Sequence, residues 1–159
     1  MSALRSKLSI FLLISIFSLF HSSCHREKYD VIPDVLVDFY IDLTDPEFFD
    51  LNAIGNFVLI DSSTNNMGYK AAGYDGNGII VYRAQPDEFI ALDRTCPHDY
   101  VLDRTSIAVE VDGIYAECPL CGSSFALPSY GTPSSGPSQY PLKIYRARFT
   151  GQFVHVSNY

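Results

Sequence analysis

After residue 30, apolar and polar residues alternate along much of the chain with a period close to two. Successive side chains of an extended strand point to opposite faces, so this alternation, with many β-branched and aromatic residues, predicts strands. The stretches with this pattern are 35–43, 57–60, 78–83, 89–95, 107–111, 142–149 and 152–158. Several short strands of this kind predict an all-β fold.

Glycine-containing segments lie between several of these strands. Segments 75–78, 111–113 and 150–151 contain glycine, which adopts positive φ at little cost, so we expect hairpin turns there. No sustained 3.6-residue period occurs outside the N-terminal region, although 45–54 is compatible with a short turn of helix capped by Asp45. Segment 129–141 is rich in Gly, Pro and Ser, which is typical of a surface loop.

The first residues differ from the rest of the chain. Arg5 and Lys7 precede an apolar run from Leu8 to Phe20, and small polar residues then lead to Cys24. This order is typical of a secretory signal, and a run of about thirteen residues is shorter than the roughly twenty that span a bilayer. A cleaved signal therefore fits better than a transmembrane anchor.

The segment "HSSC" that ends in Cys24 resembles a bacterial lipoprotein signal, in which cleavage before the cysteine leaves it to be acylated. We expect a signal peptide over 1–23, a lipidated Cys24 with a tether over 24–30, and one folded domain over 31–159. The resemblance implies an exported protein that is lipid-anchored to a periplasmic or other cell-envelope membrane. The alternative is that Cys24 is an unpaired cysteine beyond a general signal site.

Composition and charge restrict the function classes. The chain has 159 residues, of which 47% are apolar and 14% aromatic, as expected for one globular domain. Its formal net charge is -7. A phosphate-binding surface needs concentrated Lys and Arg, so we expect no nucleic-acid partner.

The remaining cysteines form a candidate metal site. Without Cys24, three cysteines are left, and an odd number of thiols cannot all pair. They lie in a Cys-x-His pair, Cys96 and His98, and a Cys-x-x-Cys pair, Cys118 and Cys121. Two such pairs can surround one metal ion or cluster.

Two other interpretations of the cysteines remain open. Cys118 and Cys121 could form a disulfide, which leaves Cys96 unpaired. Alternatively, three thiolates and the imidazole of His98 are a standard tetrahedral ligand set for structural zinc. Ligand chemistry alone does not separate zinc from an iron-sulfur cluster.

The two pairs also carry a family resemblance. "CPH" at 96–98, "CPLCGSSF" at 118–125 and "SGP" at 135–137 are similar to the Rieske 2Fe-2S domain. The resemblance covers most of the chain after the signal and is strongest from Phe89 onward. It implies a small antiparallel β-sandwich or barrel of Rieske type with two metal-binding loops.

The resemblance also implies roles for individual residues. Cys96 and Cys118 match the family's thiolate ligands, and His98 matches one of its imidazole ligands. Cys121 stands where the family has its second histidine. Ser123 matches a serine whose hydroxyl donates to a bridging sulfide.

Further positions match a loop that shields the cluster or depart from the family. Gly136 and Pro137 match the shielding loop. Phe125 replaces a tyrosine that donates to a cysteine sulfur in high-potential members. Thiolate in place of imidazole at Cys121 adds negative charge, and both changes predict a potential below the roughly -150 to +300 mV of two-histidine centres.

The function implied by the resemblance is the transfer of single electrons to or from a redox protein partner that the sequence does not identify. We expect no substrate turnover and assign no catalytic residue. The expected cofactor is a 2Fe-2S cluster, with zinc as the alternative. The alternative function is a structural zinc, or metal-free, β-domain that acts as an interaction module.

Overall fold

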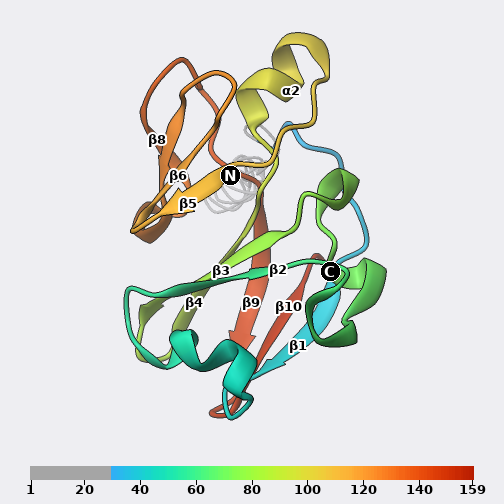
Figure 1. The fold of residues 1–159 in the computed structure, drawn as a ribbon, viewed down its shortest axis with the longest axis vertical. Helices are drawn as coiled ribbons and strands as arrows, with labels where there is room; N and C mark the ends of the chain where they lie inside the picture. Colours follow the sequence, from blue (N-terminus) through green and yellow to red (C-terminus); the bar gives the residue numbers. More distant parts are fainter. Residues whose placement is uncertain (1–29) are drawn as a thin grey trace, which may run out of the picture.

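A computed structural model describes residues 30–159 of the chain. Its larger sheet has six strands in the order β1-β10-β9-β4-β3-β2, and each neighbouring pair is antiparallel (Figure 1). The strands are β1 (Asp38–Asp42), β2 (Phe57–Ile60), β3 (Ile79–Gln85), β4 (Glu88–Asp93), β9 (Ile144–Phe149) and β10 (Phe153–Ser157). The C-terminal hairpin therefore lies between the first strand and the central β3–β4 hairpin.

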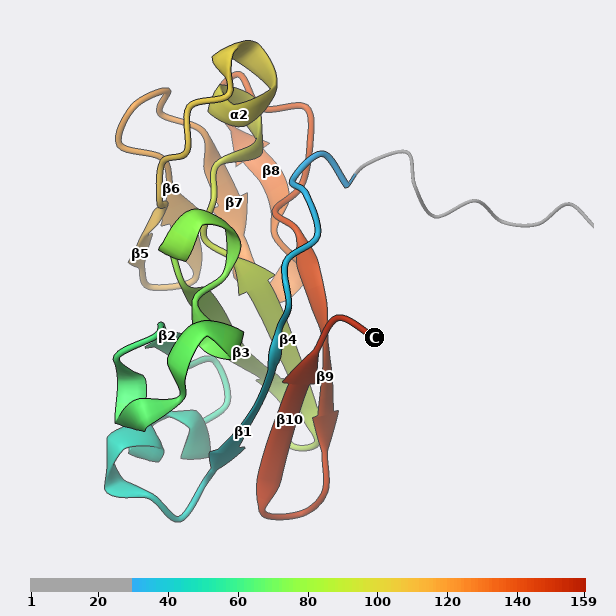
Figure 2. The ribbon, with the colours of Figure 1, turned by 90° about the vertical axis from the view of Figure 1, so that its right-hand side faces the viewer.

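A smaller antiparallel sheet is inserted between β4 and β9. Its strands run in the order β5-β6-β7-β8. They are β5 (Glu110–Asp112), β6 (Tyr115–Glu117), β7 (Ser124–Ala126) and β8 (Thr132–Ser135), and the helix α2 (Pro97–Asp103) precedes them. In Figure 2 the small sheet and α2 lie together at one end of the molecule, beyond the ends of β4 and β9.

The β3–β4 hairpin packs against both halves of the core. Ile79, Val81 and Ala91 belong to a buried cluster with β1 and β10, whereas Ile80 and Leu92 belong to a cluster with the small sheet. Alternate side chains of a strand point to opposite faces, so a strand buried on both faces is apolar throughout. This explains the continuous apolar run "IIVY" in β3.

The expected all-β antiparallel fold class is confirmed. Strands occur in every stretch where alternation predicted one, although β5 is restricted to the end of 107–111. The hairpin turns expected at 111–113 and 150–151 join β5 to β6 and β9 to β10. Asp45 caps the short 3-10 helix η3 (Pro46–Asn52), with its Oδ1 accepting a hydrogen bond from the Glu47 N–H at 3.0 Å.

Two sequence-based expectations are wrong. Segment 75–78 is no hairpin turn, because no strand leads directly into it. The 3-10 turns η4 (Thr64–Asn66) and η5 (Gly68–Ala71) precede it, and η6 (Tyr74–Gly76) overlaps its first residues. The Asn77 amide donates hydrogen bonds to Thr95 Oγ1 and Ser106 Oγ and fixes this segment against the small-sheet insertion.

The other correction concerns the residues after Cys96, where we expected a loop. They form α2, with Pro97 at its first position and Arg104 closing it at φ +66°. Proline suits the first position of a helix because its missing N–H has no partner there. Seven residues are too few for a 3.6-residue period to be visible in the sequence.

Additional short elements were not expected. The Gly-, Pro- and Ser-rich segment 129–141 contains β8, which pairs with β7. Its backbone is therefore partly held by a strand ladder. A further 3-10 helix, η7 (Leu127–Ser129), joins the two strands.

The signal peptide over 1–23 and the lipidation site Cys24 lie outside the described residues, as does the tether up to residue 29. Within residues 30–159, no helix has the length and apolar character needed to cross a bilayer.

Candidate metal centre

Cys96 lies at the exit of β4, directly before α2. Its backbone N–H donates to the Ile107 carbonyl at 2.8 Å, and its carbonyl accepts from the Tyr100 N–H at 3.2 Å. The first bond ties it to the segment leading into β5, and the second begins the helix. The side chain is fully buried.

Cys118 and Cys121 lie in the tight loop between β6 and β7. The Gly122 N–H donates to the Cys118 carbonyl at 3.0 Å, and the Cys118 N–H donates to the Ser123 carbonyl at 2.8 Å. Gly122 has φ +71°, a conformation that glycine adopts without strain. The loop thus turns both thiols to the same side.

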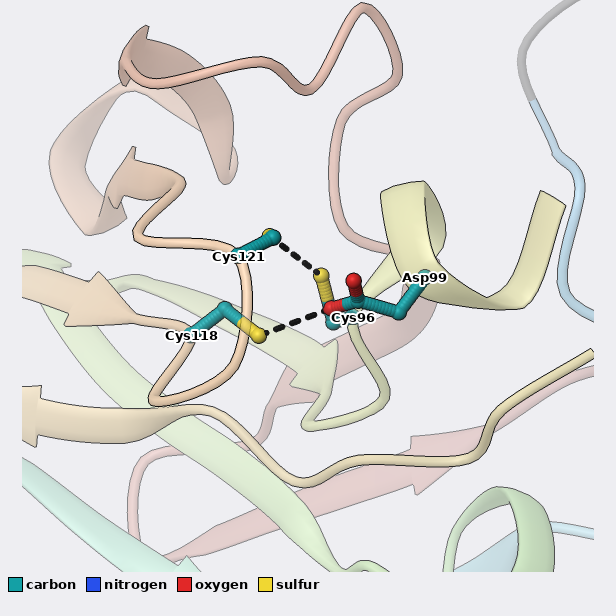
Figure 3. A group of neighbouring side chains, drawn as sticks. All are labelled: Cys96, Asp99, Cys118 and Cys121. Atoms are coloured by element: carbon teal, nitrogen blue, oxygen red, sulfur yellow. Dashed lines mark hydrogen bonds between the residues drawn. The ribbon is translucent and has the colours of Figure 1, made fainter. Parts of the chain in front are cut away.

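The two segments bring the three thiols together with the carboxylate of Asp99. One donor atom each from Cys96, Asp99, Cys118 and Cys121 lies within 4.8 Å of the other three. Cys96 Sγ is 3.7 Å from Cys121 Sγ, and Cys118 Sγ donates to Asp99 Oδ2 at 2.9 Å (Figure 3). All three cysteines of residues 30–159 are free thiols.

His98, the expected imidazole ligand, does not belong to this group of donor atoms. It is the second residue of α2 and is half-buried. Asp99, which is only 4% exposed, lies beside the thiols instead. Sequence reasoning missed Asp99, and the signal that could have found it is an acidic residue three positions after a proline-flanked cysteine.

Ser123 lies next to the thiols and is fully buried. Its Oγ accepts hydrogen bonds from Cys121 Sγ at 3.1 Å and from the Ser138 N–H at 3.0 Å. A hydroxyl has one donor and two acceptor sites, so its hydrogen is left for a further acceptor. Ser123 therefore lies beside Cys121, and a Cys121 thiolate would accept the hydrogen of the Ser123 hydroxyl.

The segment after β8 covers this loop through Gly136. A Cβ atom on Gly136 would lie 2.5 Å from Ser123 Cα and 2.7 Å from the Gly122 carbonyl oxygen. Backbone therefore packs on backbone at this point, and no larger residue fits.

Burial determines the protonation of the site. It raises the pKa of Cys96 far above the usual thiol value, and it raises that of Cys118 to about 11, with the Asp99 carboxylate adding to the shift. Burial also acts to raise the pKa of Asp99, but the hydrogen bond from the Cys118 thiol, together with the neighbouring Cys96 and Cys121 thiols, outweighs it and holds that pKa below its usual value. At neutral pH, Cys96 and Cys118 are thus thiols that a metal must deprotonate.

The donor set suits a thiolate-bound metal. A tetrahedral ion with sulfur at about 2.3 Å has ligand atoms about 3.8 Å apart, close to the observed Cys96–Cys121 separation of 3.7 Å. Thiolates are also the common ligands of iron-sulfur clusters. The residues therefore fit either zinc or a 2Fe-2S cluster.

No protein-family model and no curated protein matches the chain. Several solved structures are similar to it. A chain of the complex of reduced oxygenase and oxidized ferredoxin in carbazole 1,9a-dioxygenase matches with TM-score 0.48 and 20% identity, over 78% of this chain and 95% of that one.

Two other similar structures are ferredoxins. That of Sphingomonas yanoikuyae B1 matches with TM-score 0.38 and 25% identity, over 50% of this chain and 74% of its own. The ferredoxin of carbazole 1,9a-dioxygenase from Nocardioides aromaticivorans IC177 matches with TM-score 0.41 and 20% identity, over 69% and 91%. Likenesses this distant assign no function to the chain.

Proposed function

We propose that the chain is a Rieske-like electron carrier that holds a 2Fe-2S cluster between its two cysteine loops. The observation that carries the proposal is the convergence of Cys96 with Cys118 and Cys121, although 21 residues separate Cys96 from the second pair. When bound, such a cluster takes up and releases one electron at a time. The fourth donor comes from the start of α2.

The surrounding residues support this role. Cys96 and Cys118 are buried, which keeps water from their sulfurs. The Ser123 hydroxyl lies 3.1 Å from Cys121 Sγ and would donate to that sulfur once it is a thiolate, and hydrogen bonds to sulfur stabilise the reduced state. Gly136 allows the segment after β8 to close over this loop.

A structural zinc site is the second candidate function. Its support is the compactness of the four donor atoms, which lie within 4.8 Å of one another. In this case the ion would hold α2 against the β6–β7 loop, and the domain would act through its surface as an interaction module.

The proposed cellular setting rests on the sequence of the first residues alone. The order of basic residues, apolar run and Cys24 supports export and lipid anchoring to the cell envelope. A redox protein would be the partner of the cluster-bearing form.

The decisive experiment measures iron, acid-labile sulfide and zinc per chain. The full-length protein would be purified anaerobically in detergent from iron-replete cells. About two irons and two sulfides per chain support the electron carrier, and about one zinc without sulfide supports the structural site. A chain that takes up neither metal would refute both.

For the cluster-bearing form, a redox titration gives a second test. One more thiolate and no tyrosine at Phe125 predict a potential below roughly -150 mV and at or above about -400 mV. A midpoint well above about 0 mV contradicts the ligand assignment of Cys121.

A further inference from the structure

We propose that Asp99, and not His98, is the fourth protein ligand of this metal centre, which makes it a site of three cysteines and one aspartate. The inference rests on the proposed function in that it requires a metal to bind here. It assigns a ligand that differs from the one predicted by the Cys-x-His pattern.

The geometry of α2 is the first argument. Side chains three apart on a helix lie on one face, whereas those two apart do not. Cys96 occupies the N-cap position of α2, and a carboxylate oxygen of Asp99, three positions later, lies within 4.8 Å of its sulfur, whereas His98 does not belong to this group of donor atoms.

Figure 3 shows the result of this geometry. Cys96 and Asp99 point from the start of α2 toward Cys118 and Cys121 on the facing loop. Asp99 Oδ2 is 2.9 Å from Cys118 Sγ. An ion that binds the three sulfurs would therefore find this oxygen beside it.

The charge of Asp99 is the second argument. The carboxylate is 4% exposed and accepts a hydrogen bond from the Cys118 thiol. Metal binding removes the thiol protons, so Asp99 would lose its donor and remain buried among thiolates. Unpaired buried charges are strongly unfavourable, and coordination to the cation restores a partner.

The chemistry of the donor is compatible with this role. Zinc is bound in proteins by Asp oxygen at about 2.0–2.2 Å as well as by Cys sulfur and His nitrogen. One carboxylate oxygen can thus complete a tetrahedral set with three sulfurs.

The first test uses Zn²⁺ as the probe on the full-length protein. X-ray absorption at the zinc edge should show three sulfurs and one oxygen at about 2.0–2.2 Å, without the outer-shell scattering of an imidazole. If the iron-loaded form is obtained, pulsed EPR of protein labelled with ¹⁵N-histidine should show no directly bound nitrogen. An imidazole signal in either measurement overturns the proposal.

A matched pair of neighbouring variants gives the second test. His98→Gln should bind Zn²⁺ within about threefold of the parent, measured by competition with a chromophoric chelator. Asp99→Asn keeps the side-chain shape, and its affinity for Zn²⁺ should fall by more than about 100-fold. Removal of an outer-sphere partner lowers metal affinity by only roughly 10- to 100-fold. Far-UV circular dichroism of both metal-free variants checks that they fold.

The outcomes separate the inference from the proposed function. If metal binds but His98→Gln abolishes binding while Asp99→Asn keeps it, Asp99 is not the ligand and the metal centre stands. If the parent protein binds neither zinc nor iron with sulfide, the metal centre itself is wrong, and the ligand assignment falls with it.

Discussion

At the residue scale, Ser123 connects the metal site to the segment that covers it. Its Oγ contacts Cys121 Sγ and the Ser138 N–H, and the side chain has no exposed surface. The neighbouring Ser124 contacts Ser134 instead. The two adjacent serines therefore have different contacts, so a variant of Ser124 is a matched control for a variant of Ser123.

Ser123→Ala should lower the potential of a bound cluster by about 60–130 mV. This is the one-electron equivalent of the roughly 1.5–3 kcal/mol that a hydrogen bond to a charged group is worth. Redox titration of the full-length variant measures it. Ser124→Ala is the control and should leave the potential within error, and an equal shift in both variants would contradict the role of Ser123.

Tyr145 is a second residue whose surroundings predict a measurable effect. It is 2% exposed and donates to Asp93 Oδ2 at 2.6 Å, and that carboxylate also accepts from the Tyr74 and Thr95 N–H groups. Burial, and then the charge of Asp93, raises the pKa of Tyr145 far above its usual value. The folded protein thus keeps the Tyr145 proton where an unfolded tyrosine, with its pKa near 10, releases it.

The free energy of unfolding should therefore fall as pH rises above about 10. The unfolded state then binds fewer protons than the folded one, so the Tyr145 contribution has a slope of up to about -1.4 kcal/mol per pH unit. Tyr145→Phe should remove this part of the slope. Urea unfolding at pH 8–11 measures the free energy of unfolding of both proteins. If the two plots of this free energy against pH stay parallel, the assignment to Tyr145 is wrong.

At the element scale, the segment after β8 depends on a close backbone approach. Gly136 has φ +83°, and an added Cβ would overlap Ser123 Cα. Gly151, in the β9–β10 hairpin, has a similar φ of +92° but nothing within 4 Å of its Cβ position. Both glycines have a positive φ that is strained for other residues, and they differ in the steric overlap that a Cβ atom would meet.

Gly151→Ala should lower the free energy of unfolding by about 1–3 kcal/mol, the usual range for a non-glycine residue at positive φ. Gly136→Ala should lower the free energy of unfolding by more, because the segment after β8 must also move away from Ser123. It should weaken metal retention as well, whereas Gly151→Ala should not. Urea unfolding and metal content measure the two effects, and equal losses in both variants would mean that the packing against Ser123 is unimportant.

At the scale of the whole molecule, the metal centre lies where the insertion meets the main sheet. Cys96 and Cys118 belong to the buried cluster that includes Leu92 of β4 and Phe125 of β7. A metal that binds the folded chain and not the unfolded one stabilises the entire domain.

Free metal at about 100 times its dissociation constant should raise the free energy of unfolding by about 2.7 kcal/mol. For a chain of this size the melting temperature should rise by about 5–10 °C. Calorimetry with and without a chelator measures the shift. The control is the double variant Cys118→Ser and Cys121→Ser, and a shift of the same size in that variant would place the binding elsewhere.

The sequence by itself determined the strands and the positions of the three cysteines. Alternation in stretches such as 35–43 and 152–158 depends only on which face of a strand is buried, and this is local information. The pairs at 96–98 and 118–121 likewise marked the candidate site through residue type and spacing. Asp45 was found as a cap because the side chain bonds to its own neighbours.

The tertiary structure decided which donors meet. Residues 97–103 carry no visible helical period, and only the tertiary structure shows that they are helical and that Asp99 accepts a hydrogen bond from Cys118 of the β6–β7 loop. The pairing of β8 with β7 is similarly set by contacts and not by the Gly, Pro and Ser content of 129–141. A ligand set depends on the direction of each side chain, and that direction is fixed by backbone conformation, which spacing in the sequence does not specify.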